Sequence, residues 1–179
     1  MANFDIFWAE NGQKIKMRLL KMGDIQKARD FINACVVENL MLLMDKKITI
    51  QEEKKQVIGF IQKMEEGRGI YLVAEADKKI VGICSLERQP YRQNHIARFG
   101  IALLTGYQGI GIGTELAKRT LKLAKEMRGL EIIELSAFAI NDKAIDFYKK
   151  LGFKEVARIP NYFKYDGKSV DGIVMHHKP

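Results

Sequence analysis

The sequence is poor in residues that cross-link a protein or bind metals. Its 179 residues include two cysteines, Cys35 and Cys84, and three histidines, and no cysteine, histidine and carboxylate group has metal-ligand spacing. Both cysteines stand among apolar residues, so we expect buried free thiols in a cytoplasmic protein without a metal site. Three prolines and the absence of repeats or low-complexity segments indicate a single domain over residues 1–179.

Long apolar runs and blocks of one charge are also missing. No run is long enough to cross a bilayer, and the first residues lack the pattern of a secretory signal. The formal net charge is +8, but lysines and arginines are interspersed with acids along the whole chain. This pattern argues against membrane association and against nucleic-acid binding as the main function. It suits a small polyanionic ligand.

The hydrophobic periodicity predicts an α/β domain. The order is strand, two helices, three strands, helix, strand, helix and two strands, with Asp24 as the cap of the first helix. The three central strands are joined as an antiparallel meander, and Asp77-Lys78 and Asp166-Gly167 form hairpin turns. The expected strands cover 14–20, 70–76, 79–87, 95–104, 131–139, 153–165 and 168–177, and the later helices cover 51–65, 111–127 and 141–152. We therefore expect one sheet of mixed direction.

A glycine-rich stretch, YQGIGIGTELAK (residues 107–118), leads into the third helix. Glycine is costly for folding, and a run of it at a helix N-terminus is typical of an anion site. A nucleoside triphosphate loop would need a lysine followed by Ser or Thr after its last glycine, which is missing here. A dinucleotide-binding fold would begin with parallel βαβ units and not with a meander. Two interpretations remain: a loop that binds a pyrophosphate through backbone N–H groups, or merely a tight strand-to-helix connection.

Two segments carry a resemblance to a known family. YQGIGIG resembles the Q/R-x-x-G-x-G/A signature of the GNAT superfamily of N-acetyltransferases, with Gln108, Gly111 and Gly113 at the named positions. NDKAIDFYKKLGF (141–153) is similar to the following motif of that family. The resemblance extends over about residues 17–175. It implies a mixed, mostly antiparallel sheet flanked by helices, with two parallel strands that splay apart where acetyl-CoA, the acetyl donor, binds.

The resemblance also implies the residues that contact the donor. These are Ile101, Ala102 and Leu103, which would face the pantetheine arm with their backbone groups, Gln108, Gly109, Ile110, Gly111, Ile112, Gly113 and Thr114 at the pyrophosphate, and Asn141 and Tyr148 on the next helix. The N–H of Leu103 would polarise the thioester carbonyl, and the phenol of Tyr148 would protonate the departing thiolate. Asn141 is explained equally well as a plain helix cap.

The base that deprotonates the amine is not identified by the sequence. Glu134 on the strand after the third helix is one candidate, and Glu87 is another. A chain of water molecules without a dedicated base is a third option, and His95 has a suitable reference pKa but stands at a strand entrance.

The acceptor pocket of this family is formed by the first two helices, their connecting loop and the last strands. Candidate acceptor residues in these segments are Glu38, Asp45, Tyr162, Phe163 and Tyr165. The sequence thus predicts transfer of an acetyl group to a primary amine of a small molecule, a polyamine or a peptide N-terminus, by direct attack in a ternary complex. The alternative is a non-catalytic acetyl-CoA sensor of the same fold. A sheet edge or the C-terminal hairpin offers a surface for a homodimer.

Overall fold

A computed structural model describes residues 6–179. Within this range eight strands form one sheet in the order β1-β2-β3-β4-β5-β6-β8-β7, and every neighbouring pair is antiparallel except β5 and β6. The strands are β1 (Ile6–Trp8), β2 (Lys14–Leu19), β3 (Gly69–Ala76), β4 (Lys79–Arg88), β5 (Ile96–Leu103), β6 (Ile132–Phe138), β7 (Lys154–Tyr165) and β8 (Lys168–His177). The predicted mixed, mostly antiparallel sheet is confirmed.

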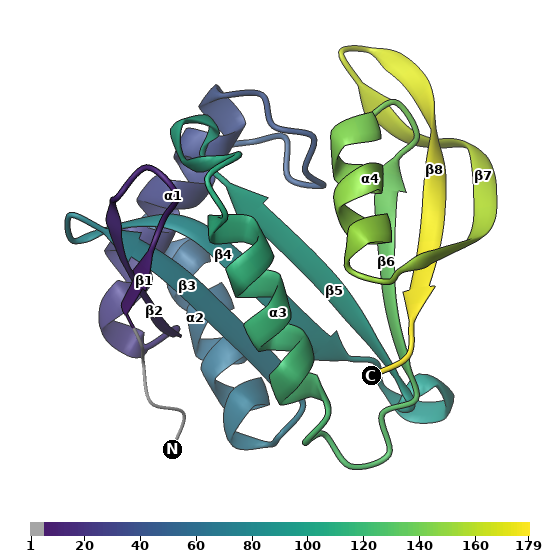
Figure 1. The fold of residues 1–179 in the computed structure, drawn as a ribbon, viewed down its shortest axis with the longest axis horizontal. Helices are drawn as coiled ribbons and strands as arrows, with labels where there is room; N and C mark the ends of the chain where they lie inside the picture. Colours follow the sequence, from purple (N-terminus) through teal and green to yellow (C-terminus); the bar gives the residue numbers. More distant parts are fainter. Residues whose placement is uncertain (1–5) are drawn as a thin grey trace.

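Four α-helices cover the two faces of this sheet in the described residues (Figure 1). They are α1 (Ile25–Val37), α2 (Ile50–Glu65), α3 (Ile112–Ala124) and α4 (Asp142–Lys150), with 3₁₀ turns η1 (Met22–Asp24), η2 (Tyr91–Gln93) and η3 (Thr105–Tyr107). One core lies between α3, α4 and the front of the sheet, and a second lies between α1, α2 and the back.

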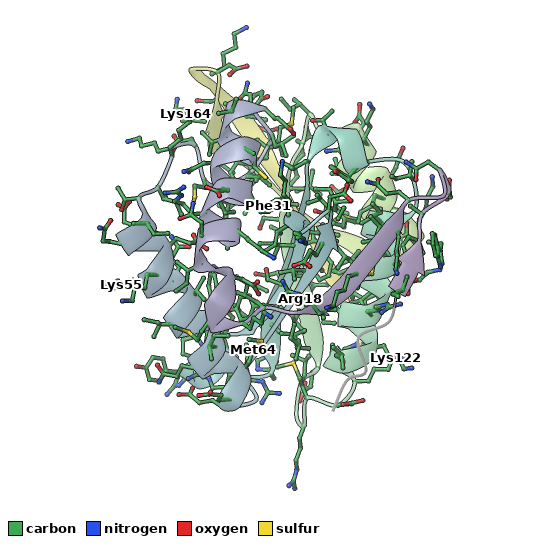
Figure 2. The ribbon with its side chains drawn as sticks, turned by 90° about the vertical axis from the view of Figure 1, so that its left-hand side faces the viewer. Arg18, Phe31, Lys55, Met64, Lys122 and Lys164 are labelled. Carbon is green, nitrogen blue, oxygen red and sulfur yellow. The ribbon has the colours of Figure 1, made fainter. Side chains whose placement is uncertain are left out.

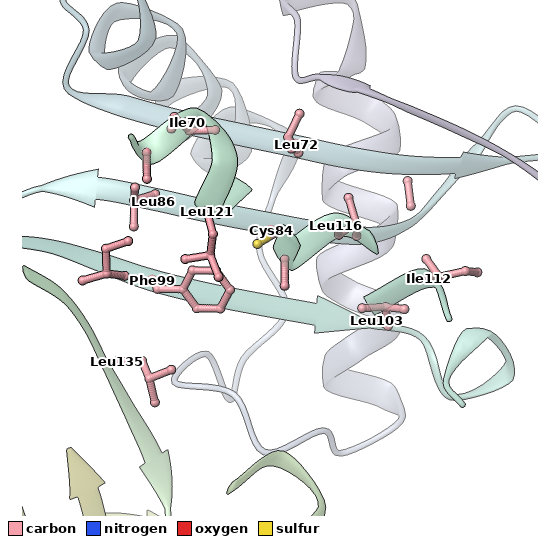
Figure 3. Close-up of a cluster of buried hydrophobic side chains, with 14 of the residues drawn as sticks. Ile70, Leu72, Cys84, Leu86, Phe99, Leu103, Ile112, Leu116, Leu121 and Leu135 are labelled. Carbon is pink, nitrogen blue, oxygen red and sulfur yellow. The ribbon is translucent and has the colours of Figure 1, made fainter. Parts of the chain in front are cut away.

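The front core is built from alternate residues of the strands and one stripe of α3. Leu116 and Leu121 of α3 face Leu72, Cys84 and Leu86 of the meander (Figure 3). Side chains alternate between the faces of a strand, so the residues between these positions supply the back core. Both cysteines are buried, and neither forms a disulfide in the described chain, as predicted.

The two predicted hairpin turns are confirmed by their backbone angles. Asp77 and Lys78 have φ of 48° and 64°, and Asp166 and Gly167 have φ of 48° and 74°. Two successive residues with positive φ match the right-handed twist of the strands that they join.

Other boundaries differ from the prediction. The first strand is β1, which pairs with β2 and is only three residues long, too short for a periodic pattern. Helix α2 begins after Thr49, whose hydroxyl and backbone N–H form a capping box with Glu52. Asp24 precedes α1 but gives the helix no side-chain cap. Its carboxylate instead accepts hydrogen bonds from Arg18.

The carboxylate of Asp24 belongs to a buried ion cluster that fixes α1 to the sheet. Both Asp24 oxygens accept hydrogen bonds from the Arg18 guanidinium, at 2.5 and 2.7 Å, and one also accepts from the Lys21 N–H at 3.0 Å. Arg18 donates further to Glu75 at 2.6 Å. Asp24 is 1% exposed and Arg18 5% exposed. Figure 2 shows Arg18 and Phe31 near the middle of the molecule, whereas Lys55 and Lys122 lie at its edges.

We expect Asp24→Asn to destabilise the protein strongly. The substitution leaves the buried Arg18 charge without its main partner, which typically costs about 3 kcal/mol or more of unfolding free energy. Asp30→Asn is the matched control, because Asp30 lies in α1, the helix that Asp24 directly precedes, and pairs with Arg29 at the surface, where the loss stays below about 1 kcal/mol. Urea unfolding of the two variants measures the difference. Equal losses would contradict the structural role of the Arg18–Asp24 pair.

Candidate functional site

Strands β5 and β6 start side by side and then separate. Their parallel pairing is limited to Ile96 with Ile132, Ala97 with Ile133 and Arg98 with Glu134. Beyond these pairs β5 stays bonded to β4, and β6 stays bonded to β8. The inner edges of both strands therefore face a wedge-shaped opening in the middle of the sheet, as the predicted splay requires (Figure 1).

The register decides which backbone groups of β5 face this opening. The N–H of Leu104 donates to the carbonyl of Val81 on β4 at 3.0 Å. Backbone groups of alternate residues on a strand point to opposite edges, so those of Ile101 and Leu103 point away from β4, toward the opening. The backbone of Ala102 points toward β4, and Ala102 thus presents only its side chain to the site. The expectation that all three residues offer backbone groups is corrected on this point.

The glycine stretch forms the N-terminus of α3. Gly109 and Gly111 have φ of +73° and +86°, a region that residues with a side chain rarely adopt. Gly111 is the N-cap, and the first helical hydrogen bond runs from the N–H of Glu115 to its carbonyl. Across residues 6–179, no N–H from Gly109 to Thr114 has a hydrogen-bond acceptor. Six adjacent donors at a positive helix terminus make this loop a suitable anion site.

The other residues of the loop have different roles. The side-chain amide of Gln108 donates to the carbonyl of Leu103 at 3.0 Å, so Gln108 ties the loop to the end of β5. Ile112 is fully buried and offers only its backbone, whereas Ile110 is half-buried and Thr114 is exposed. At Gly113 an added Cβ would lie 3.5 Å from Leu103 Cδ1, an ordinary contact. The protein itself therefore does not require glycine at position 113.

Helix α4 supplies an aromatic hydroxyl on the front side of the opening. The ring of Tyr148 packs edge-on against Phe99 of β5, with ring centroids 6.3 Å apart. Its hydroxyl has no hydrogen-bond partner among the described residues, and burial raises the pKa of Tyr148. Asn141 caps α4 by accepting a hydrogen bond from the N–H of Ala144 at 3.1 Å. The cap role of Asn141 is thus established, and its side-chain amide remains available to a ligand.

One large cavity connects the opening with the back of the sheet. Its volume is about 850 Å³. The opening contributes Gly100, Ile101, Ala102, Ser136 and Tyr148 to its lining. Further lining comes from α1, from the loop between α1 and α2, from α2, and from Tyr162 and Phe163 on β7. The segments expected to form the acceptor pocket therefore meet the splayed strands in one space.

The two predicted carboxylates of this cavity are both paired with cations. Glu134 Oε2 lies 3.2 Å from His176 Nε2, and its Oε1 lies 3.8 Å from Arg98 Nε. Glu87 forms an ion pair with Lys63. Their side chains are 25% and 31% exposed, respectively. Both carboxylates line the cavity, and each has a side-chain partner.

A third carboxyl, that of Glu53, was missed by sequence analysis. It lies in the first turn of α2, is 3% exposed, and lines the same cavity. Neighbouring Glu52 caps the helix at the surface, and nothing in the run QEEKK distinguishes the two acids. The signal would have been the helical spacing of Glu53 with Val57, both of which face the core.

The remaining candidates lie outside the cavity or support its walls. His95 and Asp45 do not line it. Glu38 accepts hydrogen bonds from the N–H and hydroxyl of Thr105, at 2.8 and 2.9 Å, and so joins α1 to the loop after β5.

The hairpin tip is bound to the loop between α1 and α2. The Tyr165 hydroxyl donates to the carbonyl of Asn39 at 3.1 Å, and the Asn39 side chain donates to Asp166 at 3.3 Å. These contacts join segments 126 and 127 positions apart at the rim of the acceptor side.

The described residues lack two further kinds of feature, a metal-binding cluster and a membrane-spanning helix. No group of three or more His, Cys, Asp and Glu side chains is placed to hold a metal ion. None of the helices described is long and apolar enough to span a membrane.

Comparisons with known proteins agree with this geometry. The acetyltransferase (GNAT) family model matches residues 37–153, more than half of the chain. An N-alpha-acetyltransferase of Sulfurisphaera tokodaii is 33% identical over 115 residues, which cover 58% of this chain and 68% of the relative. The L-amino acid N-acetyltransferase AaaT of Escherichia coli is 30% identical over 105 residues, covering 58% and 65%, respectively. The aligned segments thus span about two thirds of these relatives.

Solved structures share the fold over nearly the whole chain. An acetyltransferase of the GNAT family from Streptococcus pneumoniae superposes with a TM-score of 0.83 at 21% identity, covering 92% of this chain and 98% of that one. A putative acetyltransferase from Salmonella typhimurium, solved with acetyl-CoA, has a TM-score of 0.79 at 17% identity, with 92% and 93% covered. At these identities the similarity concerns the fold.

Proposed function

The chain belongs to the acetyltransferase (GNAT) family, and on this basis we propose that it transfers an acetyl group from acetyl-CoA to the α-amine of a peptide, protein or amino acid. The observation that carries the proposal is the row of six unpaired N–H donors from Gly109 to Thr114 beside the opening between β5 and β6. The α-amine is favoured over other amines because the relatives named above act, by their names, on N-alpha groups or amino acids.

The donor would lie across the front of the opening. The loop N–H groups suit the pyrophosphate, and the inner edges of β5 and β6 suit the amide groups of the pantetheine arm. The N–H of Leu103 is positioned to donate to the thioester carbonyl oxygen. A donor aimed at a developing oxyanion commonly lowers the barrier by about 3 kcal/mol.

Tyr148 is proposed as the acid for the departing thiolate. Direct attack by a neutral amine on the thioester carbon breaks the C–S bond, and the thiolate takes the phenolic proton. Because burial raises the pKa of Tyr148, the phenol is protonated throughout the neutral range. The hydroxyl is also free of other partners among the described residues, so no hydrogen bond has to be broken.

A second proposal is a non-catalytic acetyl-CoA sensor with the same donor site. The observation in its favour is that both base candidates of the sequence already have partners, Glu87 with Lys63 and Glu134 with His176 and Arg98.

A panel of acceptors distinguishes the two proposals. We expect release of free CoA thiol with peptides that carry a free α-amine, and none with the same peptides after N-terminal blocking. Lysine side chains and polyamines serve as the comparison amines. Tight acetyl-CoA binding without thiol release across the panel would favour the sensor.

Gly111→Ala should weaken acetyl-CoA binding by about tenfold or more, equivalent to roughly 1.4 kcal/mol. A side chain at φ +86° shifts the loop, and the added Cβ would lie 3.3 Å from Glu10 Oε1. Isothermal titration calorimetry measures the dissociation constant.

A control variant accompanies this one. Gly129→Ala imposes the same strain, at φ +75°, outside the loop. It should keep its affinity. An unchanged affinity in Gly111→Ala would contradict the assignment of the loop.

Tyr148→Phe should lower kcat about 100-fold while the acetyl-CoA dissociation constant stays unchanged. The ring and its packing on Phe99 are retained, and only the acid is lost. Steady-state kinetics and calorimetry on the same preparation measure the two quantities. A kcat equal to that of the unmodified protein would refute the acid role.

A further inference from the structure

The cavity contains a carboxyl group that no cation of the described chain neutralises. Glu53 has no hydrogen bond to either side-chain oxygen from residues 6–179, and its Oε2 is sealed from solvent. Burial raises the pKa of Glu53 to about 7. A buried polar group without a partner destabilises a protein, so such a group is a candidate for ligand contact.

The other two carboxyls of the cavity differ from Glu53 in this respect. Glu87 is paired with Lys63, and Glu134 is bonded to His176 and lies near Arg98. A cationic ligand at either of these carboxylates would have to compete with the partner that is already there. Of the three carboxyl groups, only that of Glu53 can pair with a cationic ligand without displacing a cationic side chain of the described residues.

The surroundings of Glu53 define the kind of ligand. The cavity wall next to α2 is apolar: α1 contributes Phe31 and Ile32, and the connecting loop contributes Met41, Leu42 and Met44. The other titratable groups that line the cavity are Tyr71 from β3, Glu87 from β4, Arg98 from β5, Glu134 from β6, Tyr148 from α4 and Tyr162 from β7. The α1 and loop residues of the wall carry no charge. An acidic group in an apolar wall suits a cationic amine next to an apolar side chain.

We propose that Glu53 binds the α-ammonium group of the acceptor and takes its proton before attack, with the apolar wall holding the acceptor's first side chain. This inference rests on the proposed function and adds the acceptor-side residue and the class of acceptor. It assigns to Glu53 the base role that sequence analysis left open between Glu134, Glu87 and water.

The proton transfer follows from burial. Removal from water disfavours the charged forms of both the ammonium and the carboxylate, so the pair relaxes to a neutral amine and a neutral acid. The nitrogen lone pair then forms the C–N bond, the C–S bond breaks, and the thiolate takes the proton of Tyr148. The second nitrogen proton returns to the Tyr148 phenolate, and Glu53 releases the first proton to solvent.

The test is Glu53→Gln in the full chain, assayed with acetyl-CoA and peptides that begin with Met-Leu or with Ser-Asp. We expect kcat/KM for the Met-Leu peptide to fall about 100-fold, with an unchanged acetyl-CoA dissociation constant. The unmodified protein should prefer the Met-Leu peptide. Glu65→Gln is the matched control, since it makes the same change at an exposed position of the same helix.

The pH dependence provides a readout that a purely structural role would not change. Glu53 must be ionised to accept a proton, so kcat/KM of the unmodified protein should rise with pH through about 7. Above about pH 8 it should fall again, because the free α-amine then loses the proton that Glu53 takes. Glu53→Gln should lose the rise near pH 7 and rise only near pH 8, because it depends on acceptor that is already neutral in solution.

Stability separates loss of function from misfolding. Folding raises the pKa of Glu53 above its unfolded value of 4.5, so the folded state holds the extra proton, and stability falls as pH rises from about 4.5 to 7. Glu53→Gln lacks this loss and should melt at a higher temperature than the unmodified protein at pH 8. If the Gln variant misfolds, Glu53→Asp tests the role of the carboxyl group in its place. Its kcat/KM should still rise with pH near 7, but its maximum should be lower than that of the unmodified protein.

The outcomes are distinguishable. If the unmodified protein acetylates α-amines and Glu53→Gln does so equally well, the role of Glu53 is refuted while the proposed function stands. A loss in Glu87→Gln or Glu134→Gln with none in Glu53→Gln also overturns it. If the unmodified protein binds acetyl-CoA but acetylates no amine, the acetyltransferase function and the role of Glu53 both fail, and the sensor is favoured.

Discussion

The architecture depends on how few hydrogen-bonded pairs join β5 to β6. Three residue pairs join the two strands. Beyond them β5 is hydrogen-bonded only to β4, and β6 only to β8, among the described strands. The sheet stays continuous while two backbone edges are left open in its centre. The glycine loop lies at the end of β5, fixed there by Gln108, and Tyr148 of α4 packs against Phe99 of the same strand. The glycine loop, the proposed acid Tyr148 and the cavity thus all contact the same strand, β5.

The proposed reaction divides between the two faces of the sheet. The front carries the N–H groups of the glycine loop and the phenol of Tyr148, which are proposed to act on the donor. The back carries α1, α2 and their loop, whose side chains line part of the cavity. The buried Arg18–Asp24 pair holds α1 against this back face. Neither Arg18 nor Asp24 lines the cavity, so this ionic contact supports α1 from outside the proposed site.

Sequence patterns identified the features that are local in the chain. The alternating strands, the two hairpin turns, the glycine stretch and the cap at Asn141 each depend on residues within a few positions, and the structure has them where they were expected. Features that depend on partners far away were missed. The sequence around Asp24 indicates a helix cap, but in the structure its carboxylate pairs with Arg18. The sequence does not distinguish Glu53 from its neighbour Glu52, which caps α2 at the surface. Hydrophobic periodicity predicts which face of a helix is apolar. Whether an acidic side chain at the edge of that face is solvated or buried depends on how the helix packs in the fold.

The hydrogen bonds between Asn39 and the tip of the β7–β8 hairpin have a consequence for turnover. They connect the two walls of the acceptor side through exposed, neutral or singly charged groups, each of which stabilises the contact by only about 1 kcal/mol. Their rupture disturbs neither core. In the proposed enzyme these walls would part to release the product while the donor strands stay in place, so product release would depend on surface contacts and not on the packing of the sheet.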